Sequence, residues 1–304
     1  MVQIRNYMVC TRCYTYNHSQ FIKEALDGFS MQKTTFPVVT VIVDDASTDG
    51  EQEVIRQYLI DNFEKPYNVE ETDYATTICA CHKNNTNCEF VAILLKYNHF
   101  RIRRPKMPYL LKWYKNSKYY ALCEGDDFWT DPNKLQRQVL FLENNPDFSM
   151  SFHDVSITSG HKYYTSPPKN FLTAKDIILR HYIPTASVVV RRSISEKTKE
   201  YGLSFGDIPF EIQVSLYGKV VFFPETMGEY RDNNSGSITH DKRQGIRGLK
   251  DSVRVYFFLL RDYPFTKYSI FLLYKFLRAI FLYPRNYVML LKRNKSNLFE
   301  GVKS

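Results

Sequence analysis

The chain is poor in glycine, with 12 among 304 residues, and it contains no internal repeat or low-complexity segment. These absences exclude a fibrous protein, and a hydrophobic content of 44% excludes an intrinsically disordered one. The length is sufficient for one large or two small globular domains with a sizeable core.

The chain also lacks a long uninterrupted apolar segment. Its first ten residues, MVQIRNYMVC, contain no hydrophobic region of the kind found in secretory signals. The longest apolar run, YSIFLLYKFLRAIFLYP, is broken by Lys275 and Arg278 and falls short of the roughly 20 residues that cross a bilayer. We therefore expect a cytoplasmic protein.

The cysteines lack the spacing of a usual zinc site. Cys79, Cys81 and Cys88 lie near His82, but this arrangement has neither the two-residue gap nor the second ligand pair of such sites. We interpret the stretch as part of an irregular loop with reduced thiols, and structural zinc is the alternative. The remaining cysteines are interpreted as small core residues: Cys10, Cys13 and Cys123.

Positive charge is in excess, with a net charge of +9 and an isoelectric point near 9.1. A basic surface suits an anionic partner, which can be nucleic acid, acidic lipid or a phosphorylated substrate. The alternative is a basic protein whose charge serves solubility alone.

The first half of the chain alternates strand-like and helix-like segments, which predicts an α/β fold with a mostly parallel, Rossmann-like sheet. Strands are expected at 7–15, 37–43, 90–98 and 118–123, helices at 17–32, 51–62 and 108–116, and irregular structure at 64–89. Each expected strand ends in polar residues. We therefore expect these polar clusters to converge at one edge of the sheet, where open α/β sheets bind ligands.

The rest of the chain is less regular in pattern. A helix is expected between Pro132 and Pro146, strands at 148–155 and 185–192, and a helix, a strand at 219–223 and a polar loop within 206–240. The last 55 or so residues look helical, aromatic and basic.

Four acidic residues follow the expected strand at 118–123: Glu124, Asp126, Asp127 and Asp131. Like charges this close repel, and a hard divalent cation such as Mg²⁺ or Mn²⁺ would offset the repulsion. The alternative is helix capping, which fits Asp131 before Pro132. Capping cannot explain Glu124 or Asp126, because both lie too far upstream of the helix.

Three motifs together resemble glycosyltransferase family 2, the inverting nucleotide-sugar transferases with the GT-A fold. They are VCTRCYTYNHSQFIKEALDGF, VTVIVDDASTDG and ALCEGDDFWTDPNKLQRQVLFLENNP, in that order. The resemblance covers roughly residues 5–155 and continues more weakly to about 240. It implies a nucleotide-sugar-binding half at 1–150, an acceptor-binding half at 151–245, and a helical tail at 246–304. The EGDD variant is typical of bacterial polysaccharide-building members.

The resemblance also implies roles for individual residues. Asp126 and Asp127 would hold a divalent metal, whereas Glu124, which replaces the usual first aspartate, would contact ribose or water. The remaining residues implied to bind the nucleotide-sugar are Tyr14, Tyr16, Asn17, Asp44, Asp45, Asn98, Gly125 and Arg231. A carboxylate such as that of Asp45 can accept the N3–H of uracil, which favours a UDP-sugar. Core packing is the alternative for both tyrosines.

An inverting transfer needs one carboxylate base near the acceptor hydroxyl. By the resemblance this base is Asp207, at the start of an expected helix, with Glu211 one turn later as the second choice. A helix cap is the alternative for Asp207. The residues expected to line the acceptor pocket are His153, Asp154, Thr185 and Ser187.

The basic aromatic tail allows two interpretations. Its mixture of bulky apolar residues, tyrosines and cations is typical of helices that lie in a membrane interface. Alternatively, it forms a helical pair docked on the catalytic domain. Because the family often uses polyprenyl-diphosphate-linked acceptors, we expect peripheral contact with an anionic membrane at the inner face of the cell.

Other classes of protein fit less well. A nucleotidyltransferase usually carries a Gly-rich basic loop after its first strand, and TYNHSQ has none. A nucleic-acid-binding protein needs cations at the ligand edge, where this chain places acids, so we expect no nucleic-acid partner. A nucleotide-sugar hydrolase and a catalytically silent sugar-binding relative remain as alternatives.

Overall fold

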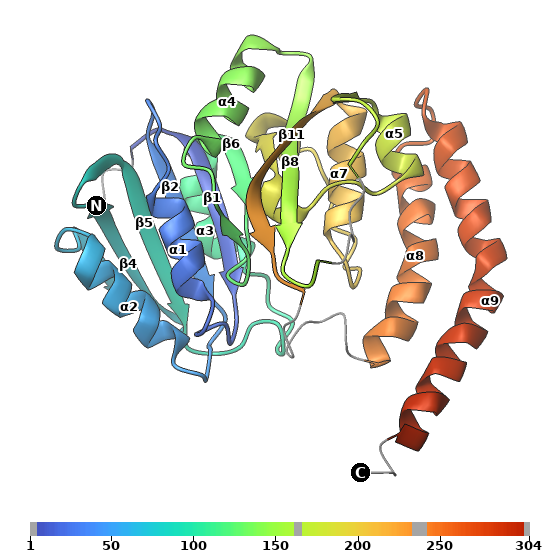
Figure 1. The fold of residues 1–304 in the computed structure, drawn as a ribbon, viewed down its shortest axis with the longest axis horizontal. Coiled ribbons are helices and arrows are strands. Elements are labelled where there is room, and N and C mark those ends of the chain that lie inside the picture. The colour runs from blue at the N-terminus through green and yellow to red at the C-terminus, as the bar shows by residue number, and fades with distance from the viewer. Residues whose placement is uncertain (1–4, 161–165, 233–241, 301–304) are drawn as a thin grey trace.

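The computed structural model describes residues 5–160, 166–232 and 242–300, with side chains of the last range described from 247 to 287. An 11-stranded mixed sheet has the strand order β3-β4-β5-β2-β1-β6-β10-β8-β11-β7, and β9 pairs with β11. Helices cover both faces of the sheet, and two long helices flank one end of it (Figure 1). The expected α/β architecture is confirmed.

Parallel strands form the middle of the sheet: β5 (Asn85–Leu95), β2 (Val38–Asp44), β1 (Tyr7–Thr15) and β6 (Ser117–Leu122). β2 is buried at every position, because helices cover both of its faces, and it is therefore almost continuously apolar instead of alternating. Thr15 lies opposite Asp44, and Asp44 lies opposite Leu94. The polar segments that follow these strands therefore begin at the same edge.

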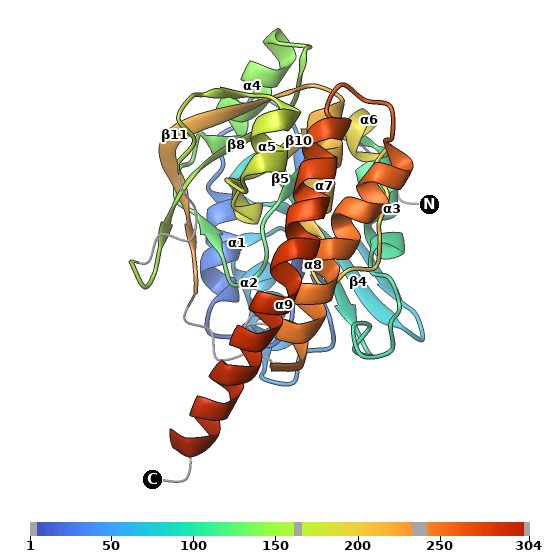
Figure 2. The same cartoon turned by 90° about the vertical axis from the view of Figure 1, so that its right-hand side faces the viewer.

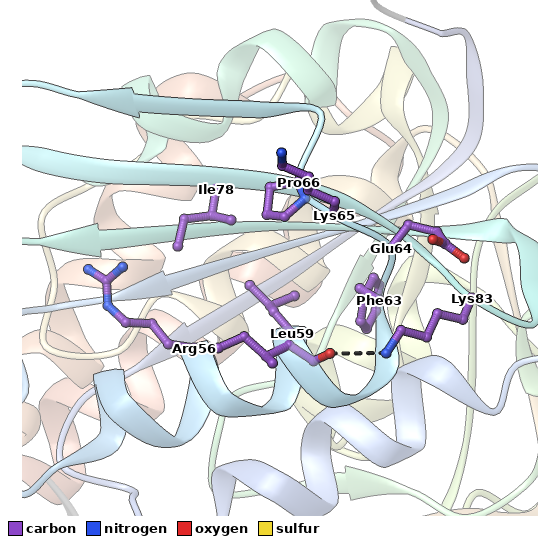
Figure 3. A pocket seen from close by; sticks show the side chains of 9 residues that line it. Arg56, Leu59, Phe63, Glu64, Lys65, Pro66, Ile78 and Lys83 are labelled. Atoms are coloured by element: carbon purple, nitrogen blue, oxygen red, sulfur yellow. Dashed lines mark hydrogen bonds between the residues drawn. The ribbon is translucent and has the colours of Figure 1, made fainter.

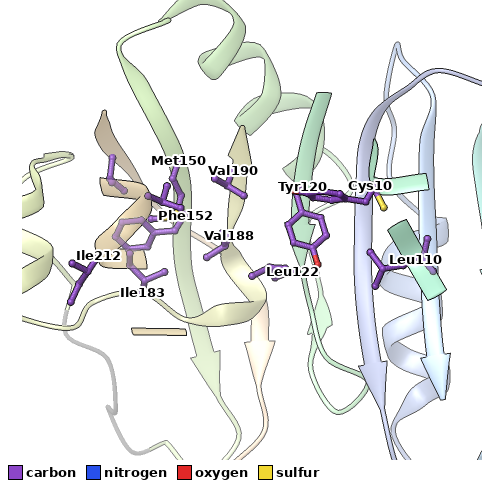
Figure 4. Close-up of a cluster of buried hydrophobic side chains, with 14 of the residues drawn as sticks. Cys10, Leu110, Tyr120, Leu122, Met150, Phe152, Ile183, Val188, Val190 and Ile212 are labelled. Atoms are coloured by element: carbon purple, nitrogen blue, oxygen red, sulfur yellow. The ribbon is translucent and has the colours of Figure 1, made fainter. Parts of the chain in front are cut away.

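Two sets of helices cover the two faces. One face buries apolar residues of α1 (Ile22–Ser30), α2 (Glu51–Asn62) and α4 (Lys134–Asn144). The other face packs against α3 (Met107–Lys115), α5 (Ala174–Leu179) and α7 (Asp207–Leu216). Figure 4 shows part of this second cluster, where Tyr120 and Leu122 of β6 lie beside Val188 and Val190.

The stretch at 64–89 is not irregular, contrary to the prediction. It contains β3 (Asn68–Glu71), β4 (Ala75–His82) and the start of β5, all paired antiparallel at one edge of the sheet. The asparagine-rich part is a tight hairpin turn between His82 and Asn85, which explains its loop-like composition. Cys79 and Cys88 are buried free thiols on these strands.

The second half of the chain extends the same sheet. β8 (Phe148–Ile157) pairs in parallel with β11 (Lys219–Tyr230), and β10 (Val189–Arg191) joins β8 to β6 in antiparallel fashion. β11 is longer than the predicted strand at 219–223, because its second part pairs with β7 (Phe128–Trp129). The short elements are β9 (Phe171–Leu172), the 3₁₀ turn η1 (Thr185–Ser187) and α6 (Arg192–Ser195).

The C-terminal segment is helical, as predicted. α8 (Lys242–Asp262) and α9 (Ser269–Glu300) lie side by side as a hairpin (Figure 2). Val255, Leu259 and Leu272 are buried against the second core cluster, so the hairpin is docked on the domain. Within the described residues, no helix has an apolar stretch long enough to span a bilayer.

Candidate active site at the carboxyl edge of the sheet

The acids at 124–127, which we call the acid turn, lie directly beside the end of β1. The Gly125 N–H donates to the carbonyl of Tyr14 at 3.1 Å, and the Asp45 N–H donates to the carbonyl of Thr15 at 3.0 Å. The turns after β1, β2 and β6 are therefore joined by main-chain hydrogen bonds. The predicted convergence of polar clusters is confirmed for these three strands.

Gly125 permits this close approach. A Cβ atom at this position would lie 2.1 Å from Thr15 Oγ1 and 2.6 Å from Thr15 Cβ. Neither atom can move away freely, since Thr15 is buried and its hydroxyl donates to the carboxylate of Glu51. The acid turn can therefore pack against β1 only with glycine at 125.

Glu124 is held by protein groups. Its Oε1 accepts from Arg12 Nη2 at 2.5 Å, and its Oε2 accepts from the Tyr14 N–H at 3.1 Å. The Arg12 guanidinium also lies over the Tyr14 ring, 4.5 Å from its centroid. This ion pair fixes the first acid of the turn, and sequence reasoning missed Arg12 because it lies inside an apolar strand.

Asp126 and Asp127 differ in their surroundings. The Asp126 side chain is 24% exposed, with His18 Nε2 3.8 Å from its carboxylate. Asp127 is 4% exposed and accepts from the Arg231 N–H at 2.9 Å. Burial, together with the neighbouring charge of Asp126, raises the pKa of Asp127 well above its usual range. Of these two carboxylates, that of Asp126 is therefore accessible and that of Asp127 is nearly covered.

Arg231 braces the acid turn in this structure. Its guanidinium donates to the carbonyl of Asp126 at 2.7 Å and to the carboxylate of Glu24, and it lies over the ring of Phe128 at 4.5 Å. The side chain is only 9% exposed. For Arg231 to bind the nucleotide-sugar, as the resemblance implies, these contacts would have to be exchanged.

The turn after β1 is built on a buried acid that the sequence analysis did not single out. Glu51 accepts from Thr15 and His18, and also from Ser47, so it ties this turn to the start of α2. Asn17 adopts a left-handed conformation with φ of 56°, and its side-chain oxygen accepts from the Thr48 N–H at 2.8 Å. These bonds join the segments TYNHS and DDASTD into one rigid unit.

The two acids at the end of β2 have different partners. Asp45 is 1% exposed and both of its oxygens are occupied, by the N–H groups of His99 and Phe100 and by Lys106 Nζ at 3.0 Å. Asp45 therefore anchors the loop at 97–106. Asn98 also contributes to this anchor, because its side chain donates to the Asp45 carbonyl at 2.9 Å.

Asp44 is fully buried beside Asp45, and its Oδ1 accepts from Ser47 and Gln52. Its Oδ2 has no hydrogen-bond partner among the described residues. Burial raises the pKa of Asp44. The Asp44 Oδ2 is therefore a hydrogen-bond acceptor that the described residues leave unused, at the position where the resemblance implies nucleotide binding.

Tyr14 and Tyr16 are both partly buried. The Tyr14 ring lies between two cations, with Lys106 Nζ 4.9 Å from its centroid and Arg12 at 4.5 Å. The Tyr16 hydroxyl accepts from Arg101 at 3.4 Å. Tyr14 therefore links the ion pair of Glu124 to that of Asp45.

A second group of titratable side chains lies at the start of α7. Each of His181, Asp207 and Glu211 offers one atom that could ligate a metal ion, and these three atoms lie within 4.8 Å of one another. Among the described residues, this is the one such group of three or more potential metal ligands. His181 Nε2 lies 3.0 Å from a carboxylate oxygen of the buried Glu211, whereas Asp207 is partly exposed. Burial raises the pKa of Glu211 to about 7, and the contact with Glu211 raises the pKa of His181. The sequence analysis missed His181.

The four residues expected to line the acceptor pocket differ in exposure. Thr185 and Asp154 are partly exposed. His153 and Ser187 are fully buried, and the Ser187 hydroxyl donates to the carbonyl of Pro184 at 2.6 Å. An acceptor would have to displace the surrounding core to touch either His153 or Ser187, because β8 and the 3₁₀ turn η1 carry them into the interior.

A groove of about 450 Å³ lies away from these residues, beside α2 and β4. Figure 3 shows its lining, in which Leu59, Phe63 and Ile78 form the floor. Lys83 donates to the carbonyls at the end of α2. None of the predicted site residues lines this groove.

No protein-family model matches the chain. The uncharacterised proteins Mb1547 of Mycobacterium bovis and Rv1520 of Mycobacterium tuberculosis are each 32% identical to it over 227 residues. These residues are 73% of this chain, and the chain spans only 58% of the length of these curated relatives.

Two solved structures have a similar fold. Residues 1–349 of S. aureus TarS in complex with UDP-GlcNAc superpose with a TM-score of 0.64 and 15% identity, over 90% of this chain and 72% of the TarS 1–349 chain. The mannosyltransferase PcManGT of Pyrobaculum calidifontis in complex with GDP-Man and Mn²⁺ gives a TM-score of 0.58 and 15% identity, over 96% of this chain and 76% of that one. The chain therefore has the α/β fold of these proteins.

Proposed function

We propose that this protein is an inverting, metal-dependent glycosyltransferase that moves a sugar from a UDP-sugar to a hydroxyl group of its acceptor. The observation that carries the proposal is the junction of the acid turn with the turns after β1 and β2. This junction lies at the carboxyl edge of the parallel strands, where open α/β sheets bind nucleotides. The similar structures support it, since one holds UDP-GlcNAc and the other GDP-Man with Mn²⁺.

The acid turn fits a divalent cation. Mg²⁺ and Mn²⁺ sites in nucleotide enzymes commonly use one or two carboxylates and leave positions for phosphate oxygens. We assign Asp126 and Asp127 to this role, because Glu124 is already paired with Arg12. When bound, the metal would neutralise charge on the departing diphosphate.

The uracil base is assigned to the end of β2. Asp44 is the better acceptor for the uracil N3–H, because its Oδ2 has no partner among the described residues, whereas both oxygens of Asp45 are occupied. Since Asp44 is buried, the base would reach this oxygen only when neighbouring groups move aside. Asp45 and Asn98 would then shape the site through the loop at 97–106. We assign Tyr14, Tyr16 and the turn at Asn17 to the adjoining part of the nucleotide site.

Asp207 is assigned as the base. The acceptor oxygen attacks the anomeric carbon, the bond from that carbon to the diphosphate oxygen breaks, and the acceptor proton moves to the Asp207 carboxylate. The helix start that carries Asp207 also brings it near His181 and Glu211. Of the two predicted acceptor-pocket residues in η1, Thr185 is the one that is partly exposed to solvent.

The acceptor class that we infer is a saccharide or a polyprenyl-diphosphate-linked saccharide, in the assembly of bacterial surface polysaccharide or lipopolysaccharide. A lipid-linked acceptor would place the enzyme at the inner face of the cell membrane in peripheral contact with the bilayer. The docked basic hairpin α8–α9 supports this placement.

A panel of UDP- and GDP-sugars tests the proposal, with Mn²⁺-dependent release of nucleotide as the measurement. We expect Asp126→Ala to lose metal-dependent nucleotide binding, and Asp207→Asn to keep binding but lose turnover by about a hundredfold or more. Asp73→Asn, at an exposed site distant in sequence from these motifs, is the matched control. Equal turnover in all four proteins would refute both assignments, and release independent of any acceptor would indicate a hydrolase.

A further inference from the structure

The outer face of α9 carries an apolar stripe from Ile270 to Phe281. The stripe consists of Ile270, Leu273, Tyr274, Leu277, Ile280 and Phe281, with exposed fractions from 41% to 83%. The spacing of three and four residues places them on one side of the helix. The opposite side carries the buried Leu272. The stripe is therefore the solvent-facing side of a helix that is already docked.

The neighbouring surface adds further apolar groups. Phe265, in the connection between α8 and α9, is 99% exposed, and Phe257 on α8 is 51% exposed. Full exposure of a phenylalanine side chain is unfavourable in water, and an exposed contiguous patch usually marks a binding surface. The hairpin therefore exposes apolar groups on α8 and in the connection as well as on α9.

The charges around the stripe are of one sign. Between residues 247 and 287 the acids are Asp251 and Asp262 alone. Both are nearly covered and paired, Asp251 with Arg254 and Asp262 with Arg261 and Lys199. The exposed cations of this stretch are Arg247, Lys250, Arg254, Arg261, Lys267, Arg278 and Arg285.

A groove between α8 and α9 combines both kinds of group. It has a volume of about 550 Å³ and is lined by Val253, Ile280, Tyr283 and Pro284, with Lys250 and Arg254 beside them. Apolar walls next to two cations match a phospholipid, whose acyl chain and phosphate need these two environments.

We propose that this face of the hairpin binds the surface of an anionic phospholipid bilayer. The stripe would enter the interface between headgroups and acyl chains, and the cations would contact lipid phosphates. A second copy of this chain is a poor occupant, because it would bring another surface of positive charge against this one. This membrane contact rests on the proposed function and assigns it to a particular surface. Vesicle binding tests it without any measurement of glycosyltransferase activity.

Co-sedimentation with vesicles tests the inference, using the full chain with vesicles of phosphatidylcholine alone and with phosphatidylglycerol added. We expect binding to the anionic vesicles only. The double variant Leu277→Ser/Phe281→Ser should lower the partition coefficient by about tenfold or more. The double variant Arg278→Gln/Arg285→Gln should lower it by a similar factor and weaken its dependence on salt.

Ile60→Ser is the matched control, because Ile60 is 68% exposed on α2, away from the hairpin. It should bind as the wild type does, and unchanged melting curves would show that all variants are folded. Equal binding of the stripe variant and the wild type overturns the inference, as does equal binding to both kinds of vesicle. A dimer that Phe281→Ser dissociates, without vesicle binding, would assign the face to self-association instead. Nucleotide release is measured for the same variants, so that a failure of membrane binding can be distinguished from a failure of the proposed glycosyltransferase activity.

Discussion

At the scale of single residues, Lys134 is the most unusual side chain next to the candidate site. It is fully buried at the start of α4, and its nitrogen has no hydrogen-bond partner among the described residues. The face of the Trp129 ring lies 4.0 Å from it. Burial lowers the pKa of Lys134 from 10.5 to about 7. The ring favours the charged form and offsets part of this effect.

This lysine should make stability depend on pH. The unfolded chain binds the lysine proton more tightly than the folded one, so stability should rise with pH between about 7 and 10.5, and the cost of burial is fully present below about 7. Lys134→Met should remove this slope and stabilise the protein at neutral pH by about 1 to 3 kcal/mol. Urea unfolding of both proteins at about pH 7 and about pH 9 measures the difference. Parallel slopes in the two proteins would contradict the assignment.

At the scale of elements, the loop at 97–106 depends on one carboxylate. Asp45 accepts two main-chain N–H groups and the Lys106 ammonium, and His99 is buried beneath the loop with its ring in contact with Tyr109. Hydrogen bonds to a buried charge contribute about 1.5 to 3 kcal/mol each when broken singly. The position of the loop therefore depends mainly on its hydrogen bonds and ion pair with Asp45.

Asp45→Asn should release this loop, because an amide NH₂ group would face N–H donors. We expect faster tryptic cleavage at Arg101 or Arg103, together with a loss of stability of about 2 kcal/mol. Asp44→Asn is the comparison: it should weaken UDP binding while leaving the cleavage rate unchanged. If Asp45→Asn instead weakens UDP binding with normal cleavage, Asp45 and not Asp44 contacts the base.

At the scale of the whole molecule, ligand binding at the carboxyl edge should stabilise the fold. The acid turn is braced from β1 by Gly125 and from the end of β11 by Arg231. Both halves of the sheet therefore meet at the proposed metal site. A ligand held there would resist separation of the two halves.

Mn²⁺ and UDP added together should raise the melting temperature by roughly 5 °C at saturating concentration, and EDTA should abolish the shift. The reason is mass action, since a ligand bound only to the folded state stabilises it. Differential scanning fluorimetry measures the effect, with Asp126→Ala as the variant that should show none. A shift of equal size in EDTA would mean that nucleotide binding does not use the metal.

Local pattern was sufficient for much of the fold. α2 has the bounds predicted, 51–62, and β1 spans 7–15 as expected, because apolar spacing follows the period of each element. The stretch at 64–89 was missed because edge strands are polar and the turn at His82–Asn85 gives it a loop-like composition. The hairpin of β4 and β5 joins the sheet through the pairing of β5 with β2, a contact between distant residues that local pattern does not contain.

The sequence by itself determined the order of the elements, the acids that follow β6 and the positive charge of the tail, because these depend on residue type and spacing along the chain. Only the tertiary structure decided which acids remain open. Glu124, Asp45 and Asp127 are paired or covered by Arg12, Lys106 and Arg231. Those partners are distant in sequence from the acids that they bind. The free energy of a buried charge depends on which group lies opposite it, and that choice is made only when the chain has folded.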